Sequence, residues 1–184
     1  MPIVMQQLDG ELRFTVSGPV CQRISDWECT LDAMVFDEQL TTGSFRGRYP
    51  VDDEMKVIMQ AIKAKGQIAP YYGAGGGRGS CVYALQWTDK GYIVRVENTT
   101  VKESAEFADE TDSVLCPQPV LTFKIDGKEL QNLRQWEHWV EQQASTSRYI
   151  YKFGQVAMGR LGYTVEVEDT QTGNMINATD YDDW

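Results

Sequence analysis

The sequence predicts an α+β fold: a single domain built mainly of an antiparallel sheet of hairpins, with two amphipathic helices packed on it. Apolar residues alternate along several short segments separated by turn sequences, which is typical of half-buried antiparallel strands. Two other segments carry apolar residues at helical spacing. Strands and helices do not alternate regularly along the chain, which argues against a doubly wound parallel sheet.

The first elements read as strands. Residues 13–17 alternate in polarity, and residues 27–36 alternate over a longer span, with Trp27, Leu31 and Val35 on one face. The longer pattern predicts a half-buried antiparallel strand. After the turn sequence Thr-Thr-Gly, residues 44–49 are expected to pair back on it.

The first helix is expected to follow Pro50, because the acidic residues 52–54 favour a helix N-terminus. Gly66 is expected to end this helix. Its apolar residues recur at helical spacing and are Met55, Ile58, Met59 and Ile62.

A hairpin is expected over residues 81–99, because two alternating segments flank the turn Asp89-Lys90-Gly91. Residues 162–170 repeat the pattern of residues 91–99, and they follow another apolar strand at residues 149–158. Shared turn chemistry is the interpretation we prefer, with an internal duplication as the alternative.

The second helix is expected over residues 128–143, after a short strand at residues 120–125. Residues 100–119 are too polar to pack and predict a long functional or mobile loop. The helix carries one apolar stripe, formed by Leu130, Leu133, Trp136 and Val140. The side chains expected to be almost wholly buried are Trp27, Leu31, Ile58, Ile62, Leu85, Leu133 and Trp136.

The four cysteines lack CxxC spacing and lie in apolar or strand-like segments. This usage favours reduced core thiols over metal ligands or disulfides. We therefore expect no metal and no cofactor. The four are Cys21, Cys29, Cys81 and Cys116.

The chain of 184 residues carries a formal net charge of −10, and residues 93–184 hold 16 of its acidic residues against 8 basic ones. A surface of this sign repels nucleic acid and anionic lipid and attracts basic partners. We expect no direct nucleic-acid binding and no membrane association. A purely solubilising role for the charge is the alternative. The N-terminal residues show no signal-peptide pattern, so a cytoplasmic protein is expected.

The glycine-rich segment 73–79 matches neither a dinucleotide-binding nor a P-loop pattern, and a strand rather than a helix is expected after it. A mobile connection is the simplest interpretation. A glycine loop can still bind an anion through backbone N–H groups, with an arginine supplying charge. The residues of that alternative site are Gly75, Gly76, Gly77, Arg78 and Gly79.

No catalytic constellation stands out. His138 is the single histidine, and the common serine-nucleophile and zinc-protease motifs are absent from the sequence. We assign no catalytic residue and do not expect an enzyme.

We expect a small acidic protein-binding module that neutralises or inhibits a basic protein, as immunity proteins, antitoxins and enzyme inhibitors do. The alternatives are a ligand-binding domain or enzyme with the anion site at residues 73–79, and a structural or assembly subunit. Residues 1–179 are expected to form the domain, and residues 180–184 a frayed acidic tail. The candidate partner-binding residues are Glu103, Glu106, Asp109, Glu110, Asp112, Trp139, Asp180, Tyr181, Asp182, Asp183 and Trp184.

Overall fold

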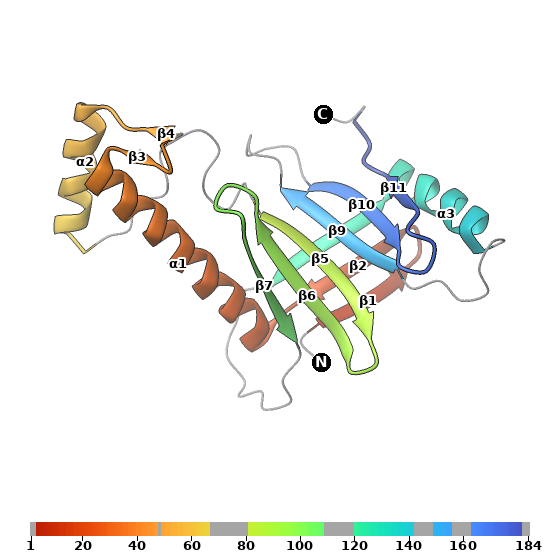
Figure 1. The fold of residues 1–184 in the computed structure, drawn as a ribbon. Coiled ribbons are helices and arrows are strands. Elements are labelled where there is room, and N and C mark those ends of the chain that lie inside the picture. Colours follow the sequence, from red (N-terminus) through yellow and green to blue (C-terminus); the bar gives the residue numbers. More distant parts are fainter. Residues whose placement is uncertain are drawn as a thin grey trace.

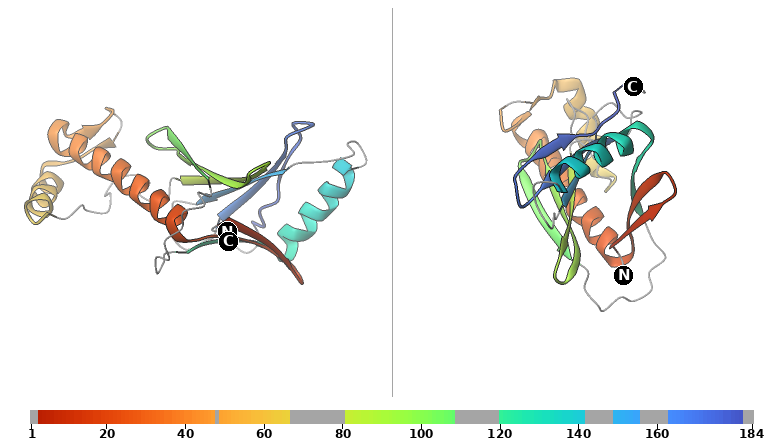
Figure 2. Two further views of the ribbon diagram at one scale, coloured as in Figure 1. Left: turned by 90° about the horizontal axis from the view of Figure 1, so that it is seen from below. Right: turned by 90° about the vertical axis from the view of Figure 1, so that its right-hand side faces the viewer.

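The structure is a computed structural model that describes residues 3–47, 49–66, 81–108, 120–141, 149–155 and 163–181. Over this part of the chain the fold is α+β with antiparallel sheets, as the sequence predicts (Figure 1). Two sheets lie face to face, and helices flank them at either end (Figure 2). Of the helices described, none is long and apolar enough to cross a membrane.

The smaller sheet has the strand order β1-β2-β8, and both pairings are antiparallel. The segments expected at residues 13–17 and 120–125 correspond to β2 and β8, whereas β1 was not predicted. Gly10 adopts a φ of +77° in the tight turn between β1 and β2. The strands are β1 (Ile3–Leu8), β2 (Glu11–Val16) and β8 (Leu121–Asp126).

The larger sheet has the order β11-β10-β9-β5-β6-β7, again with antiparallel pairing throughout. The hairpin expected over residues 81–99 is confirmed as the pair β5 and β6. The strands are β5 (Cys81–Thr88), β6 (Gly91–Asn98), β7 (Glu103–Ala108), β9 (Tyr149–Gln155), β10 (Tyr163–Asp169) and β11 (Met175–Asn177).

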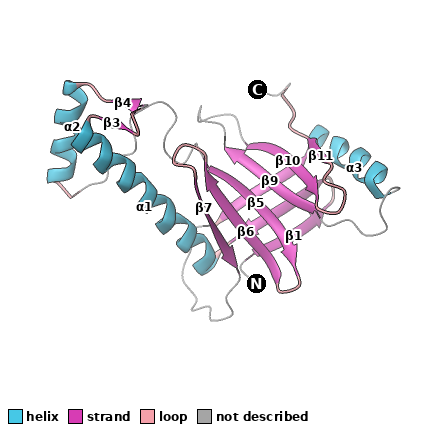
Figure 3. Ribbon diagram, viewed as in Figure 1, coloured by secondary structure: helices cyan, strands magenta, loops and turns pink. Residues whose placement is uncertain are grey.

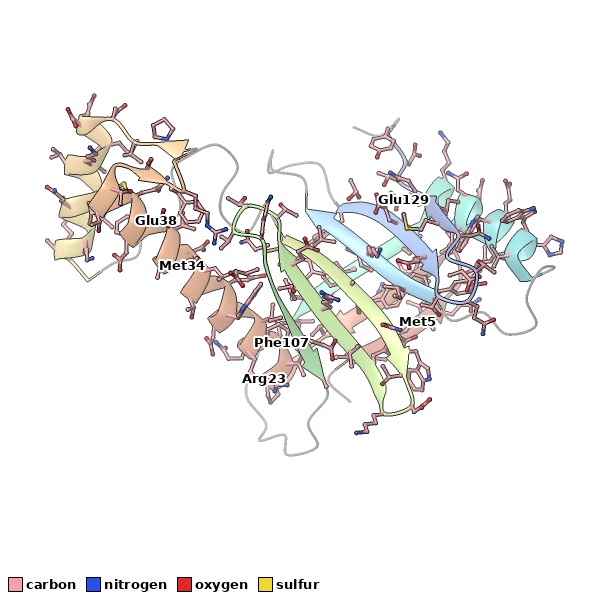
Figure 4. The ribbon with its side chains drawn as sticks, viewed as in Figure 1. Met5, Arg23, Met34, Glu38, Phe107 and Glu129 are labelled. Carbon is pink, nitrogen blue, oxygen red and sulfur yellow. The ribbon has the colours of Figure 1, made fainter. Side chains whose placement is uncertain are left out.

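Strand β7 corrects the expectation of a continuous loop over residues 100–119. The segment is polar, but Phe107 is buried beneath the sheet and packs edge-on against Trp27. Figure 4 shows Phe107 beside Arg23, whose guanidinium Nη2 donates a 2.7 Å hydrogen bond to the carbonyl oxygen of Ala108. The polar sequence forms a strand because it pairs with β6 and buries one aromatic side chain, and neither feature is evident from its polarity.

The core lies between the two sheets. Phe14 and Phe123 of the smaller sheet are fully buried against Phe153 of the larger one, and the Phe123 and Phe153 rings stack at 4.7 Å. Helix α3 (Gly127–Glu141) covers one end of the sandwich with the buried side chains of Leu133 and Val140. This helix and its apolar stripe match the prediction.

Helix α1 (Gly18–Thr42) replaces the strand expected over residues 27–36, and that prediction was wrong (Figure 3). A proline near its start and Gly43, with a φ of +79°, at its C-terminus delimit the helix. The buried positions recur every three or four residues, but two of them are polar, which obscured the helical period. They are Ile24, Glu28, Leu31, Val35 and Gln39.

Beyond the sheets, α1 carries a second small group of elements, the arm, which is formed by β3 (Ser44–Phe45), β4 (Tyr49–Pro50) and α2 (Asp53–Ala64) (Figure 1). β3 pairs with β4 and not with residues 27–36, because those residues are helical. The helix expected after Pro50 is confirmed, and the Asp52 carboxylate caps it by accepting from the Met55 N–H at 2.7 Å.

Helix α2 packs on α1 and not on a sheet, contrary to the expectation. Its Met59 is buried with Phe36 and Val51. Ile58 is 43% exposed, so its predicted burial was wrong. Of the other side chains expected to be almost wholly buried, Leu31, Leu85 and Leu133 are buried, whereas Trp27, Ile62 and Trp136 are only half-buried.

The repeat between residues 91–99 and 162–170 corresponds to a shared turn. After β6 the Thr100 N–H donates to Asn98 Oδ1, and after β10 the Gln171 N–H donates to Asp169 Oδ1, each at 3.0 Å. The Lys102 N–H also donates to the carbonyl oxygen of Asn98, and the Gly173 N–H donates to that of Asp169, each at 2.8 Å. Both donors have positive φ, +59° and +71°. The two segments thus lead into the same type of turn, which is what the interpretation of shared turn chemistry expects.

Candidate functional site

A hollow of about 370 Å³ lies on the outer face of the six-stranded sheet, the face turned away from the smaller sheet. Strand side chains alternate between the two faces, so the residues that line the hollow alternate with the buried core residues of the same strands. The lining residues are Val82, Ala84, Gln86, Ile93, Arg95, Glu97, Glu106, Ile150, Lys152 and Glu168.

The strand register arranges the charged side chains in a row across the sheet. Arg95 of β6 and Lys152 of β9 both lie opposite Ala84 of β5. Next to them on the outer strands are Glu106 of β7 and Glu166 of β10. The centre of the row is therefore cationic around a small methyl side chain, and both ends are acidic.

Some of these charges are paired and others are not. Lys152 Nζ lies 2.7 Å from Glu168 Oε2, and both side chains are half-buried. Arg95 is opposite Glu106 in register, yet within the described residues it forms no ion pair. Carboxylates outnumber cations on this face, because Glu97 and Glu166 are exposed there as well. The rim of the hollow keeps a net negative charge.

The floor of the hollow is apolar. Val82, Ile93 and Ile150 are only half-buried, although they belong to the central strands of the sheet. The solvent face of an antiparallel sheet is normally polar. Here apolar side chains instead lie on both sides of the charged row, which gives this face the mixture of apolar and charged groups that protein interfaces use.

The predicted acidic residues are divided between this face and other places. Glu106 is exposed and lines the hollow. Glu103 is exposed at the start of β7, but its register partner Asn98 is buried on the inner side of the sheet. Asp109, Glu110 and Asp112 lie outside the described residues.

The start of the predicted tail lies against α3. The N–H of Asp180 donates to Glu129 Oε1 at 3.1 Å, and its carboxylate is 3.4 Å from Lys128 Nζ. The Tyr181 hydroxyl accepts from Asn177 Nδ2 at 3.0 Å. Asp182, Asp183 and Trp184 lie outside the described residues. Asp180 and Tyr181, which were predicted to bind a partner, are thus not brought together with Glu106.

The two remaining predicted groups lie elsewhere. Trp139 is 50% exposed on α3. The alternative anion site lies outside the described residues in full, including Gly75, Gly76, Gly77, Arg78 and Gly79.

Sequence reasoning missed Arg95, Lys152 and the apolar floor. The signal was present in β5, where Val82 and Ala84 alternate with the core residues and are themselves apolar. Lys152 comes near them only because β9 pairs with β5, which local periodicity does not reveal.

A buried polar contact joins α1 to β5 beneath the sheet. The Tyr83 hydroxyl donates to Glu28 Oε1 at 2.5 Å. Burial, and then the nearby Glu28 carboxylate, raise the pKa of Tyr83. Burial and the charges of Glu28 and Asp32 raise the pKa of the neighbouring Cys81 thiol to about 12. The raised pKa keeps the thiol protonated at neutral pH, which disfavours nucleophilic chemistry at this position.

Metal chemistry has no support in the described ranges, where no three His, Cys, Asp or Glu side chains are placed to hold an ion. The apolar and charged side chains that line the hollow are suited to recognition through shape, apolar contact and charge. No protein-family model matches the chain, and neither a curated protein nor a solved structure matches it.

Proposed function

We propose that the protein is an acidic binding module that captures a basic protein partner on the outer face of its six-stranded sheet. The observation that carries the proposal is the hollow, with its half-buried floor of Val82, Ile93 and Ile150 and its acidic rim. Such a module would serve as a cytoplasmic inhibitor of the immunity-protein or antitoxin type.

The charge of the chain supports a basic partner. A net charge of −10 attracts a cationic surface over a Debye length of roughly 8–10 Å at physiological salt. Attraction of this kind mainly raises the association rate. Asp109, Glu110 and Asp112 directly follow β7 in the sequence, and we propose that they also contribute to the attraction of the partner.

The apolar floor supports direct contact with the partner in addition to long-range electrostatic attraction. A lysine or arginine of the partner can lay its aliphatic stem on an apolar surface while its charged head reaches a carboxylate. Ile93 of the floor, Arg95 and Glu97 occupy alternate positions of β6, so their side chains lie next to one another on the outer face. An interface centre of this type keeps water out of the contact and slows dissociation.

The experiment is affinity purification from the source cell, followed by binding kinetics on the recovered protein. The test variant replaces three exposed carboxylates of the outer face by amides. We expect it to recover less of a basic partner and to associate with it about tenfold more slowly than the native chain. The substitutions are Glu97→Gln, Glu106→Gln and Glu166→Gln.

A matched control changes the net charge equally at exposed positions away from the hollow. The control variant should still recover most of the partner, because the net charge of the chain alone does not form the binding site. Recovery of only neutral or acidic partners, or equal loss in both variants, would contradict the proposal. The control substitutions are Asp9→Asn, Glu54→Gln and Asp126→Asn.

A further inference from the structure

The outer edge of β1 is open within the described part of the chain. β1 is the first strand of its sheet and pairs only with β2 there. Its sequence, Ile-Val-Met-Gln-Gln-Leu, contains no charged residue and no proline. Natural proteins usually protect such an edge with lysine, proline or a bulge, because its backbone N–H and C=O groups can pair with another chain.

The end of the β5–β6 hairpin projects past this edge. The strands of the smaller sheet run across those of the larger one, and the hairpin end extends beyond β1 (Figure 1). The Tyr92 hydroxyl donates to the Met5 sulfur at 3.1 Å, which places β1 beneath the start of β6 (Figure 4). Beyond it, Trp87 packs edge-on against Tyr92 with ring centroids 5.0 Å apart.

Met5 and Trp87 belong to the inner faces of the sheets and are nevertheless exposed. Met5 pairs in register with the fully buried Phe14, and Trp87 follows the fully buried Leu85 by two positions on its strand. Yet Met5 is 37% and Trp87 is 47% exposed. The smaller sheet ends before it has covered the inner surface of the hairpin.

We infer that the β1 edge accepts an extended segment of a protein partner as a fourth strand of the smaller sheet. A strand added there lies about 4.8 Å from β1, beneath the projecting hairpin. Its backbone pairs with β1, and its alternate side chains pack on Met5, Trp87 and Tyr92. Main-chain hydrogen bonds then supply affinity and the aromatic overhang selects apolar side chains, as in other strand-addition complexes.

The chemistry of the edge defines the segment. The absence of charge along Ile3–Leu8 favours a segment that is uncharged where it pairs, with apolar residues at alternate positions. A second copy fits less well, because in a two-fold β1 pairing the projecting hairpins of both copies would lie over the same two strands. This site is independent of the proposed function, since it uses an inner face and an edge instead of the acidic outer face.

The test uses a display library of seven-residue peptides with Val, Ile, Leu, Phe or Tyr at alternate positions and Thr between them. Peptides selected on the native chain are then titrated into labelled protein. We expect shifts and slowed hydrogen exchange at the β1 amides. Methylation of alternate peptide nitrogens on the pairing edge should abolish binding, because it removes the donors that a ladder needs.

Trp87→Ala should weaken the selected peptides by about tenfold or more, the usual effect of losing an interface tryptophan. The matched control is Trp139→Ala, which removes an equally exposed tryptophan from α3 and should leave binding unchanged. Binding should also be indifferent to salt and to the outer-face amide substitutions, which separates this site from the proposed one.

Three results would overturn the inference. One is a selection that returns no peptide dependent on Trp87. Another is a peptide that shifts residues away from β1 or binds equally well when methylated. The last is self-association of the native chain that Gln6→Lys abolishes, since it would make a second copy the occupant of the edge.

Discussion

The guanidinium of Arg46 donates a 2.7 Å hydrogen bond from Nη1 to the backbone carbonyl oxygen of Val101. This contact joins the arm to the turn between β6 and β7. Phe45 and Val101 are both almost fully buried in the same small cluster, with Leu31 and Val35 of α1. The Arg46 guanidinium also lies 5.2 Å from the centre of the Phe45 ring. The arm is thus held to the sandwich by one apolar cluster and one charged donor.

Arg46→Ala should loosen the arm. The substitution removes a charge-assisted hydrogen bond and the contact with Phe45, so we expect the free energy of unfolding to fall by about 1–2 kcal/mol. Amide exchange in α2 should rise more than exchange in β5 and β6. Denaturant unfolding and hydrogen exchange measure both effects. Arg95→Ala is the control, because Arg95 is exposed like Arg46 but forms no ion pair within the described residues, so its replacement should change stability by less than about 0.5 kcal/mol. Equal effects of the two substitutions would show that the arm does not depend on Arg46.

The paired turns after β6 and β10 allow a second prediction. Lys102 has a φ of +59°, whereas the equivalent Gly173 has a φ of +71°. A residue with a Cβ is strained in this conformation, and Lys102→Gly removes that strain. Glycine also makes the unfolded chain more flexible, which offsets part of the gain. We expect a net rise in stability of about 0.5–1 kcal/mol. Gly173→Ala should lower it by about 1 kcal/mol, although an added Cβ meets no atom within 4 Å there. Thermal unfolding of both variants checks the pair, and a destabilising Lys102→Gly would refute the common-turn interpretation.

A third prediction concerns alkaline pH. Burial, with Glu28 and Asp32 nearby, raises the pKa of Cys81 from its ordinary 9.0 to about 12 in the folded chain. Between these values the unfolded chain loses a proton that the folded chain keeps, so stability falls as pH rises above about 9. The loss from one such group approaches 1.4 kcal/mol per pH unit. The raised pKa of Tyr83 adds a loss of the same sign above pH 10.

Cys81→Ala should make the decline between pH 9 and 10 shallower, whatever its effect on stability at pH 7. Urea unfolding at several pH values under reducing conditions gives the slopes. Cys29→Ala is the matched control, because Cys29 is an exposed thiol on α1. Parallel slopes for the native chain and Cys81→Ala would exclude the thiol as the source of alkaline sensitivity.

The parts of the fold that were predicted correctly are those in which one strong local pattern decides the structure. The alternation on both sides of Gly91 made the β5–β6 hairpin predictable, and the stripe around Leu133 did the same for α3. Helix α1 was mistaken for a strand because Glu28, at a buried helical position, is polar. Its carboxylate is tolerated there because the hydroxyl of Tyr83, 55 positions away in the sequence, donates to it.

The candidate site was predictable only in part, because its residues come together through strand pairing. Glu106 was identified by its charge, but its position beside the hollow depends on the pairing of β7 with β6. Ala84 and Lys152 are neighbours because β9 joins β5, and local periodicity does not encode that choice of partner. Charge indicated the kind of partner, and topology determined the surface.

The final prediction separates steering from contact at the hollow. Ala84 lies at the centre of the charged row and is half-buried, so Ala84→Trp should fill the hollow from the solvent side and leave the core intact. If a partner side chain occupies that space, the substitution should speed dissociation by about tenfold or more, because the centre of the interface is lost. The outer-face amide variant should instead slow association. Its association rate should approach that of the native chain as salt is raised, whereas the effect of Ala84→Trp should not depend on salt. Surface plasmon resonance on the recovered partner at low and high salt gives both rates. An Ala84→Trp variant that folds normally and binds with native rates would place the contact elsewhere and leave the acidic rim with a steering role alone.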